Sequence, residues 1–228
     1  MNITRNITPR QEQLLLDLVR RYIAAAEPVS SQHLADRPQV HFSSATVRND
    51  LAALESAGYV YQPHTSAGRV PTEAGYQFYV GQLPKEASLP RAILQQLDKS
   101  RGTAIGSDQL RALARAGAQA TGAAAFVAFA PYDYYYTGLS AVFSQPEFME
   151  TRLVCSLADV LDHLGLALQG MWEDVDGLDV RIGSTCPFGE SFAAVVGRTS
   201  GGALFGILGP QRLDYQASRG VVSYVIHT

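Results

Sequence analysis

A cluster of hydrogen-bonding side chains stands at the start of one predicted helix. Ser43, Ser44, Thr46, Arg48 and Asn49 supply hydroxyl groups, a guanidinium and an amide within a short stretch. The first turn of a recognition helix must stay free and polar, because its side chains meet base edges and phosphates. N–H groups at a helix start can also hold a phosphate. An ordinary amphipathic helix with a solvated face would show the same residues, so the cluster alone leaves both interpretations open.

A second polar group follows in a loop between two short predicted strands, at residues 59–62 and 69–70. The loop has turn-forming residues at both ends. The residues at or near its tip are His64, Thr65, Ser66 and Arg69. An arginine there could contact a phosphate or the minor groove, or it could be a solvated residue of a structural hairpin. The order of helix, strand, loop and strand favours DNA binding and predicts a winged helix-turn-helix.

Four predicted helices position these two groups. Thr8 caps the first helix and Pro9 takes its first position, where a missing N–H costs nothing. The helix ends by residues 27–28, because the residue before a proline avoids the α region. Ser30 or Ser31 can cap a short second helix, which we expect to stop before Pro38. Ser43 or Ser44 can cap the third helix, which has a buried row formed by Val47, Leu51 and Leu54. Thr72 starts the fourth helix.

Composition narrows the class of protein. The chain has 228 residues, a net charge of −3 and a pI near 5.9, which argues against non-specific coating of nucleic acid but allows a site-specific binder. No apolar run is long enough to cross a bilayer and the N-terminus lacks a signal-peptide core, so we expect a cytoplasmic protein and no membrane partner.

Enzyme signatures are poor. The five histidines show no metal-ligand spacing, and the two cysteines are expected to be free thiols. The glycine-rich segment 201–206 lacks the Lys-Ser/Thr of a phosphate-binding loop and fits a hairpin turn. We therefore predict that the protein is not an enzyme and that it has no catalytic residues, no metal site and no cofactor.

The second half of the sequence predicts a mixed domain. Residues 91–99, 107–122 and 153–173 are expected to be helical, and 123–130, 179–182, 192–198 and 203–208 to be strands with an antiparallel component. Residues 221–226 are too short to assign. The tyrosines at 132–136 favour core or interface over a platform for stacking bases, since no basic residues interleave with them. Residues 81–90 read as a linker, which gives a DNA-binding domain at 1–84 and a second domain at 85–228.

Several segments resemble one family of regulators. They are 8–12 (TPRQE), 27–31 (EPVSS), 44–50 (SATVRND), 62–72 (QPHTSAGRVPT) and 75–79 (GYQFY), followed by the later blocks 138–140 (GLS), 144–148 (SQPEF), 181–183 (RIG) and 209–215 (GPQRLDY). Together they resemble the heat-inducible transcription repressor family HrcA, densely over residues 5–80 and in ordered patches to about 215.

That resemblance implies an N-terminal winged helix, a GAF-like second domain and an inserted dimerisation domain. It also implies repression of heat-shock (chaperone) operons by a homodimer on an inverted-repeat operator in double-stranded DNA, with the GroEL-type chaperonin as a partner. Ser44, Thr46, Arg48 and Asn49 would lie on the recognition helix. The wing would carry His64, Thr65, Ser66 and Arg69.

The chain departs from the family between residues 131 and 138. Family members carry a long segment there, including the inserted domain and part of the GAF-like sheet. We therefore expect a shortened member: an α+β protein with an N-terminal winged helix-turn-helix followed by a reduced GAF-like α/β domain with an antiparallel sheet. Two alternatives stay open: a winged-helix regulator whose second domain senses a small ligand, and a protein-interaction module that holds a partner chain.

Overall fold

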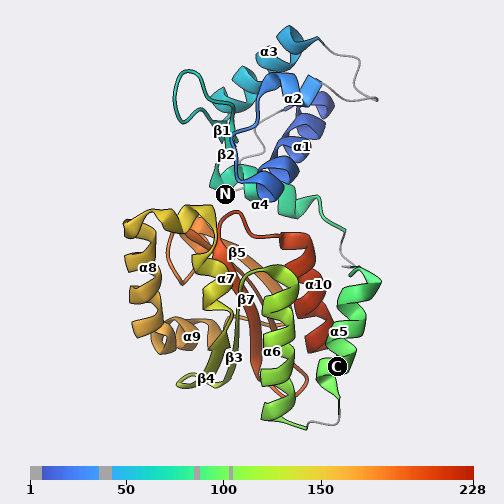
Figure 1. Cartoon of the computed structure of the whole chain (residues 1–228), viewed down its shortest axis with the longest axis vertical. Helices are drawn as coiled ribbons and strands as arrows, with labels where there is room; N and C mark the ends of the chain where they lie inside the picture. Colours follow the sequence, from blue (N-terminus) through green and yellow to red (C-terminus); the bar gives the residue numbers. More distant parts are fainter. Residues whose placement is uncertain (1–6, 36–42, 85–87, 103–104) are drawn as a thin grey trace. The chain divides into compact units, whose positions relative to one another are not determined.

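Two units divide the chain, Met1–Leu83 and Pro84–Thr228 (Figure 1). This computed structural model describes residues 7–35, 43–84, 88–102 and 105–228. The division falls within the segment 81–90 that the sequence analysis read as a linker, of which 85–87 lie outside the described residues.

Helices make up most of the first unit. In order, its elements are α1 (Pro9–Ala25), α2 (Ser31–Ala35), α3 (Ser44–Ser56), β1 (Val60–Tyr61), β2 (Val70–Pro71) and α4 (Glu73–Gly81). The predicted start of α1 is confirmed, because the Thr8 side chain accepts from the Gln11 N–H while the Gln11 side chain accepts from the Thr8 N–H. Helix α1 ends at Ala25, followed by Ala26 in the left-handed region. Helix α2 ends at Ala35, and the expected stop before Pro38 lies outside the described residues.

Apolar residues from all parts of this unit meet in one core. The buried set includes Leu15, Leu18, Val19, Leu34, Val47, Leu51, Leu54, Tyr76 and Tyr79. Strands β1 and β2 pair antiparallel, and a further bridge joins Val29 to Arg69. The Thr72 hydroxyl caps α4 by accepting from the Gly75 N–H and also donates to the Gly58 carbonyl. Through these two hydrogen bonds, the Thr72 hydroxyl ties the end of the hairpin to the end of α3.

A five-stranded antiparallel sheet dominates the second unit. Its spatial order is β4-β3-β7-β6-β5, with β4 and β5 at the two edges. The strands are β3 (Ala124–Ala130), β4 (Asp133–Thr137), β5 (Leu178–Ile182), β6 (Phe192–Arg198) and β7 (Leu204–Pro210). The hairpin predicted at residues 201–202 is confirmed: Thr199 N–H bonds the Ala203 carbonyl and Gly202 has φ 86°.

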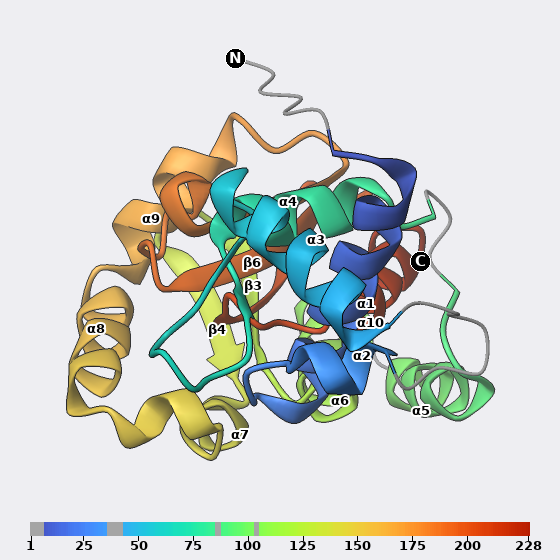
Figure 2. The ribbon, with the colours of Figure 1, turned by 90° about the horizontal axis from the view of Figure 1, so that it is seen from above.

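Helices cover both faces of this sheet (Figure 2). One layer contains α5 (Arg91–Arg101), α6 (Ser107–Thr121) and α10 (Tyr215–Ile226). The other contains α7 (Leu139–Phe143), the 3-10 turn η1 (Pro146–Met149), α8 (Thr151–Asp162) and α9 (Leu164–Trp172), and a 3-10 turn η2 (Gly183–Thr185) follows β5. Alternate residues of the buried strands serve the two layers, as the period of two in a strand requires.

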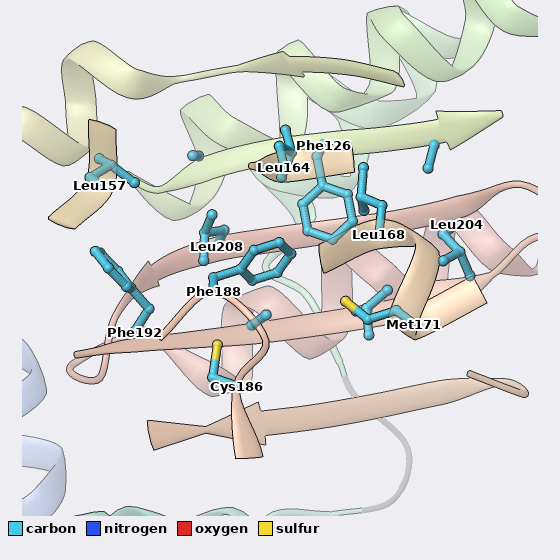
Figure 3. Packing of buried hydrophobic residues seen from close by; sticks show 14 of the residues in the cluster. Phe126, Leu157, Leu164, Leu168, Met171, Cys186, Phe188, Phe192, Leu204 and Leu208 are labelled. Atoms are coloured by element: carbon cyan, nitrogen blue, oxygen red, sulfur yellow. The ribbon is translucent and has the colours of Figure 1, made fainter. Parts of the chain in front are cut away.

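The layer of α7 to α9 encloses a dense apolar cluster. Phe126, Phe188 and Phe192 lie in it with Leu164, Leu168 and Met171 from α9 (Figure 3). The Phe126 and Phe188 rings meet edge to face at 5.5 Å between centroids. No single helix among the described residues is long and apolar enough to cross a membrane. The bent pair α8 and α9 meets the length and composition test only when taken together, at an angle of 63°.

Three elements of the second unit differ from the sequence expectation. Residues 133–137 form strand β4, which was not predicted; the tyrosines there were expected in core or an interface, and Tyr132, just before the strand, is 64% exposed. The segment that was too short to assign is the end of helix α10, which begins earlier, where the Asp214 side chain accepts from the Ala217 N–H. Helix α7 carries too few residues for a period to show.

Candidate nucleic-acid interface

The predicted N-cap of α3 forms as expected. The Ser43 hydroxyl accepts a bond from the Thr46 N–H at 3.2 Å and lies 3.0 Å from the Thr46 hydroxyl. This cap satisfies one of the free N–H groups of the first turn and fixes where the helix begins. Ser43 and Ser44 are exposed and Thr46 is half-buried. The first turn of α3 therefore presents hydroxyl groups and backbone N–H groups to solvent.

One face of α3 is buried and the other is polar. Val47, Leu51 and Leu54 are at most 3% exposed, which confirms the predicted buried row. Arg48 and Asn49 are exposed, on the side away from that row. All five residues predicted on this helix thus lie on or beside its exposed N-terminal half.

Both carboxylates of α3 have arginine partners from outside the helix. Asp50 is 5% exposed; the Arg10 Nε lies 2.7 Å from its Oδ2, and Arg10 Nη2 donates to its Oδ1 at 2.8 Å. The Gln11 amide adds a third bond at 3.3 Å. Glu55 pairs with Arg69 at 2.9 Å. Among the described residues Arg48 has no acidic partner, so the exposed half of α3 keeps a positive charge although the chain is acidic overall.

These two ion pairs also fix the helix in the unit. The Arg10–Asp50 pair joins the first turn of α1 to the middle of α3, and the Asp50 carboxylate raises the pKa of the Arg10 guanidinium by hydrogen bonding and by charge. The sequence analysis did not single out Asp50. A signal existed, because Asp50 stands three residues after Val47, on the edge of an apolar row. An acid in that position predicts a buried partner.

Hydrogen bonds inside the loop between β1 and β2 hold its backbone in place. The Gln62 side-chain amide donates to the carbonyls of Thr65 (2.9 Å) and Ala67 (2.8 Å). The His64 Nδ1 lies 3.2 Å from the Ser66 hydroxyl. His64, Thr65 and Ser66 are exposed. The loop thus presents three polar side chains on a backbone that Gln62 holds in place.

Arg69 differs from its prediction as a free residue near the tip of the loop. Its side chain is 16% exposed and pairs with Glu55 of α3. Its backbone exchanges two hydrogen bonds with Val29, of 2.8 and 2.9 Å. Glu55 also accepts from the Gln62 N–H at 3.2 Å. Arg69 therefore joins the hairpin to α3 and to the segment before α2, because the nearest carboxylate lies inside the unit.

The second unit offers little reactive chemistry. The described residues contain no group of three or more histidines, cysteines or carboxylates that could hold a metal ion. Both cysteines are free; Cys155 is exposed and Cys186 is buried. Burial raises the pKa of the Cys186 thiol to about 11, which keeps it protonated and unreactive at neutral pH.

Comparison with known proteins gives this geometry a context. No family model matches the chain. It is 53% identical over 83 residues to the heat-inducible transcription repressor HrcA of Synechococcus sp. (strain JA-3-3Ab), a match that covers 36% of this chain and 21% of that protein. It is 42% identical over 113 residues to the HrcA of Thermotoga neapolitana, which covers 50% of this chain and 33% of that protein.

A solved structure matches over nearly the whole length. The crystal structure of a hypothetical protein gives a TM-score of 0.79, at 19% identity, and covers 97% of both chains. At that identity the match shows the fold alone. The matched part of this chain spans only a fifth to a third of the HrcA relatives' own length. Over about a third to a half of its residues, this chain is nonetheless similar to the HrcA heat-inducible transcription repressors.

Proposed function

We propose that the first unit is a winged-helix DNA-binding domain whose recognition helix is α3. The observation that carries this proposal is the exposed start of α3, where Ser44, Arg48 and Asn49 face solvent while both acids of the helix are paired elsewhere. The major groove, about 12 Å wide, admits one α-helix. An arginine and an asparagine at its N-terminal end can bond guanine and adenine edges.

In this proposal the loop between β1 and β2 is the wing. His64, Thr65 and Ser66 are placed to contact the sugar–phosphate backbone beside the groove, because they are exposed and polar. Arg69 acts as a positioning residue instead, since its guanidinium pairs with Glu55 and its backbone pairs with Val29. It sets the angle of the wing relative to the recognition helix.

We propose further that the whole chain is a transcription repressor of heat-shock operons. The relatives that match it are named heat-inducible transcription repressors, and the described residues contain no group that could hold a metal ion. A homodimer on an inverted-repeat operator would place two recognition helices about one helical turn apart and block the polymerase. The antiparallel sheet between two helical layers supports a GAF-like second domain. In the cytoplasm, a GroEL-type chaperonin would favour the DNA-competent state of the repressor.

The test begins with selection of bound duplexes from a random pool by the full chain. The selected duplex is then titrated with the wild type, with Arg48→Ala and with the control Arg20→Ala, which removes an exposed arginine of α1. We expect Arg48→Ala to weaken binding by about tenfold or more and to relax preference at one base pair, whereas Arg20→Ala changes affinity little.

Three results would contradict the proposal. One is equal loss of affinity in the two variants. Another is a selected pool without any shared sequence. The third is binding of a protein partner, without DNA, that salt does not weaken, because phosphate contacts make DNA affinity fall steeply as salt rises. That third result would favour the protein-interaction module.

A further inference from the structure

We propose that strand β4 is a self-pairing edge, through which two copies of this chain join their sheets. The dimer belongs to the proposed function; its location on β4 is the new inference. Strand β4 lies at one end of the five-stranded sheet and, among the described residues, pairs with β3 alone. One row of its backbone N–H and C=O groups is therefore open to another strand.

The two edges of the sheet differ in how they are protected. The opposite edge strand, β5, carries Asp179 and Arg181, which pair with each other at 2.8 Å, and Asp174 lies 3.9 Å from the same arginine. Charges of this kind keep an edge from pairing with another chain. Strand β4 reads Asp-Tyr-Tyr-Tyr-Thr and has no lysine, arginine or proline. Its edge lacks the usual protection.

Aromatic surface lies on both faces of β4. On one face, an added Cβ at Gly165 of α9 would lie 3.0 Å from the Tyr132 ring and 3.5 Å from that of Tyr134. Tyr136 shares that face by strand alternation and is 41% exposed. On the other face Tyr135 accepts a bond from Arg115 of α6 at 3.3 Å. Tyr132 and Tyr136 are thus exposed beside the open edge, while Tyr134 and Tyr135 are half-buried.

A second copy is the occupant that this strand fits. Antiparallel pairing centred on Tyr135 places each Tyr134 opposite Tyr136 of the other copy, which makes two aromatic cross-strand pairs on one face. Asp133 then lies opposite Thr137, so the two carboxylates stay apart. Arg111 and Arg115 of α6 lie on the Tyr135 face, which is also the face of Asp133 in the other copy. The pattern of tyrosines and charges along this edge is therefore complementary to itself, as a two-fold interface requires.

The first experiment measures dimerisation of the full chain by sedimentation across a range of concentrations. Tyr136→Lys puts a charge in the pairing edge and should weaken dimerisation by about tenfold or more. Tyr61→Lys is the matched control: it makes the same change at a tyrosine of similar exposure, 47%, on β1 of the other unit, and should leave dimerisation unchanged. A wild type that stays monomeric, or a Tyr136→Lys chain that dimerises like the wild type, overturns the proposal.

Disulfide cross-linking tests the register without relying on a weakened fold. In a Cys155→Ser background, Tyr135→Cys places two thiols opposite each other at the two-fold axis and should give a covalent dimer on oxidation. Thr137→Cys lies on the same face, but its counterpart is four residues along the strand, roughly 13 Å away, and should not cross-link. Cross-linking of Thr137→Cys alone, or of neither, overturns the register.

A DNA titration separates this proposal from the proposed function. Tyr136→Lys should bind a single half-site with wild-type affinity and lose the gain that an inverted repeat provides. If the chain forms the predicted dimer and cross-link but binds no duplex, that result contradicts the proposed repressor function and supports pairing through β4. Equal affinity of wild type and Tyr136→Lys for the inverted repeat counts against β4 pairing.

Discussion

The two units of this chain use arginine in opposite ways. In the second unit Arg198 donates to the carbonyls of Val175, Gly202 and Trp172 and lies over the Trp172 ring at 5.2 Å. Each nitrogen of its guanidinium thus donates to a main-chain carbonyl. In the first unit Arg10 and Arg69 pair with the acids of α3 and leave Arg48 facing solvent. The ion pairs of the first unit therefore occupy both acids of α3, and the positive charge of Arg48 stays exposed.

This difference indicates where function resides. One ion pair of the second unit connects separate segments of its core: Arg212 and Glu147, 13% and 22% exposed, join the segment after β7 to η1. The ion pairs in the first unit hold one helix at a fixed angle while its polar half stays exposed. Damage to the second unit should mainly cost stability, whereas damage to the first should cost DNA binding together with a smaller loss of stability.

The largest expected effect comes from the core of the second unit. Phe126→Ala removes a ring buried against Phe188 and should lower the free energy of unfolding of that unit by about 3–5 kcal/mol. The control Phe143→Ala, at a ring 42% exposed, should cost less than about 1.5 kcal/mol. Urea unfolding measures both. A loss shared equally by the two units' transitions would break the comparison, since it would show one cooperative body.

A smaller effect is expected from Gly68→Ala in the first unit. A Cβ at Gly68 would lie 2.4 Å from the backbone of Val29, so the bridge between Val29 and Arg69 must open. We expect a loss of about 1–3 kcal/mol and weaker DNA binding. Gly81→Ala is the matched control, because nothing lies within 4 Å of its added Cβ. Unchanged DNA binding by a destabilised Gly68→Ala chain would argue against a positioned wing.

Removal of the buried acid of α3 should have a smaller effect still. Asp50→Ala breaks its bonds to Arg10 and Gln11, and we expect a loss of about 1–2 kcal/mol. A double-mutant cycle with Arg10→Ala, followed by thermal unfolding, isolates the pair's own contribution. Additive losses in the cycle would show that the pair does not fix the helix.

Thiol reactivity gives the smallest and simplest contrast. At pH 8 an aromatic disulfide reagent should label Cys155 quickly and leave Cys186 untouched until the chain unfolds. The Cys186 thiol has a pKa raised to about 11 from 9.0, so its stabilising effect is complete below pH 9 and is lost as pH rises through 11. Rapid labelling of two thiols per native chain would show that the second core is not closed.

Local signals in the sequence predicted most elements of the fold. Thr8, Ser43 and Thr72 are caps whose side chains bond where expected, and a buried apolar row located α3. Strand β4 was not predicted, because an edge strand need not alternate apolar with polar residues. Helix α10 was not predicted, because its N-cap, Asp214, lies well before the apolar stretch 221–226.

The exposure of the candidate site residues could be predicted where it follows from helix period, whereas partners far along the chain could not be. The exposed positions of Arg48 and Asn49 follow from the buried row that they alternate with. The Arg10–Asp50 and Glu55–Arg69 pairs join residues separated by other elements, so a local pattern can mark the acid at the edge of an apolar row but not its partner. For this reason the pairing of Arg69 with Glu55 was not predicted.

Hydrogen–deuterium exchange of the full chain, with and without its selected duplex, tests the central claim most directly. The duplex should slow exchange at the first-turn amides of α3, residues 44–46, which have no helical partner of their own, and at loop residues 64–66. The five-stranded sheet should exchange at the same rate in both states. Slowed exchange in the second unit with α3 and the loop unchanged would contradict the assignment of the DNA-binding surface.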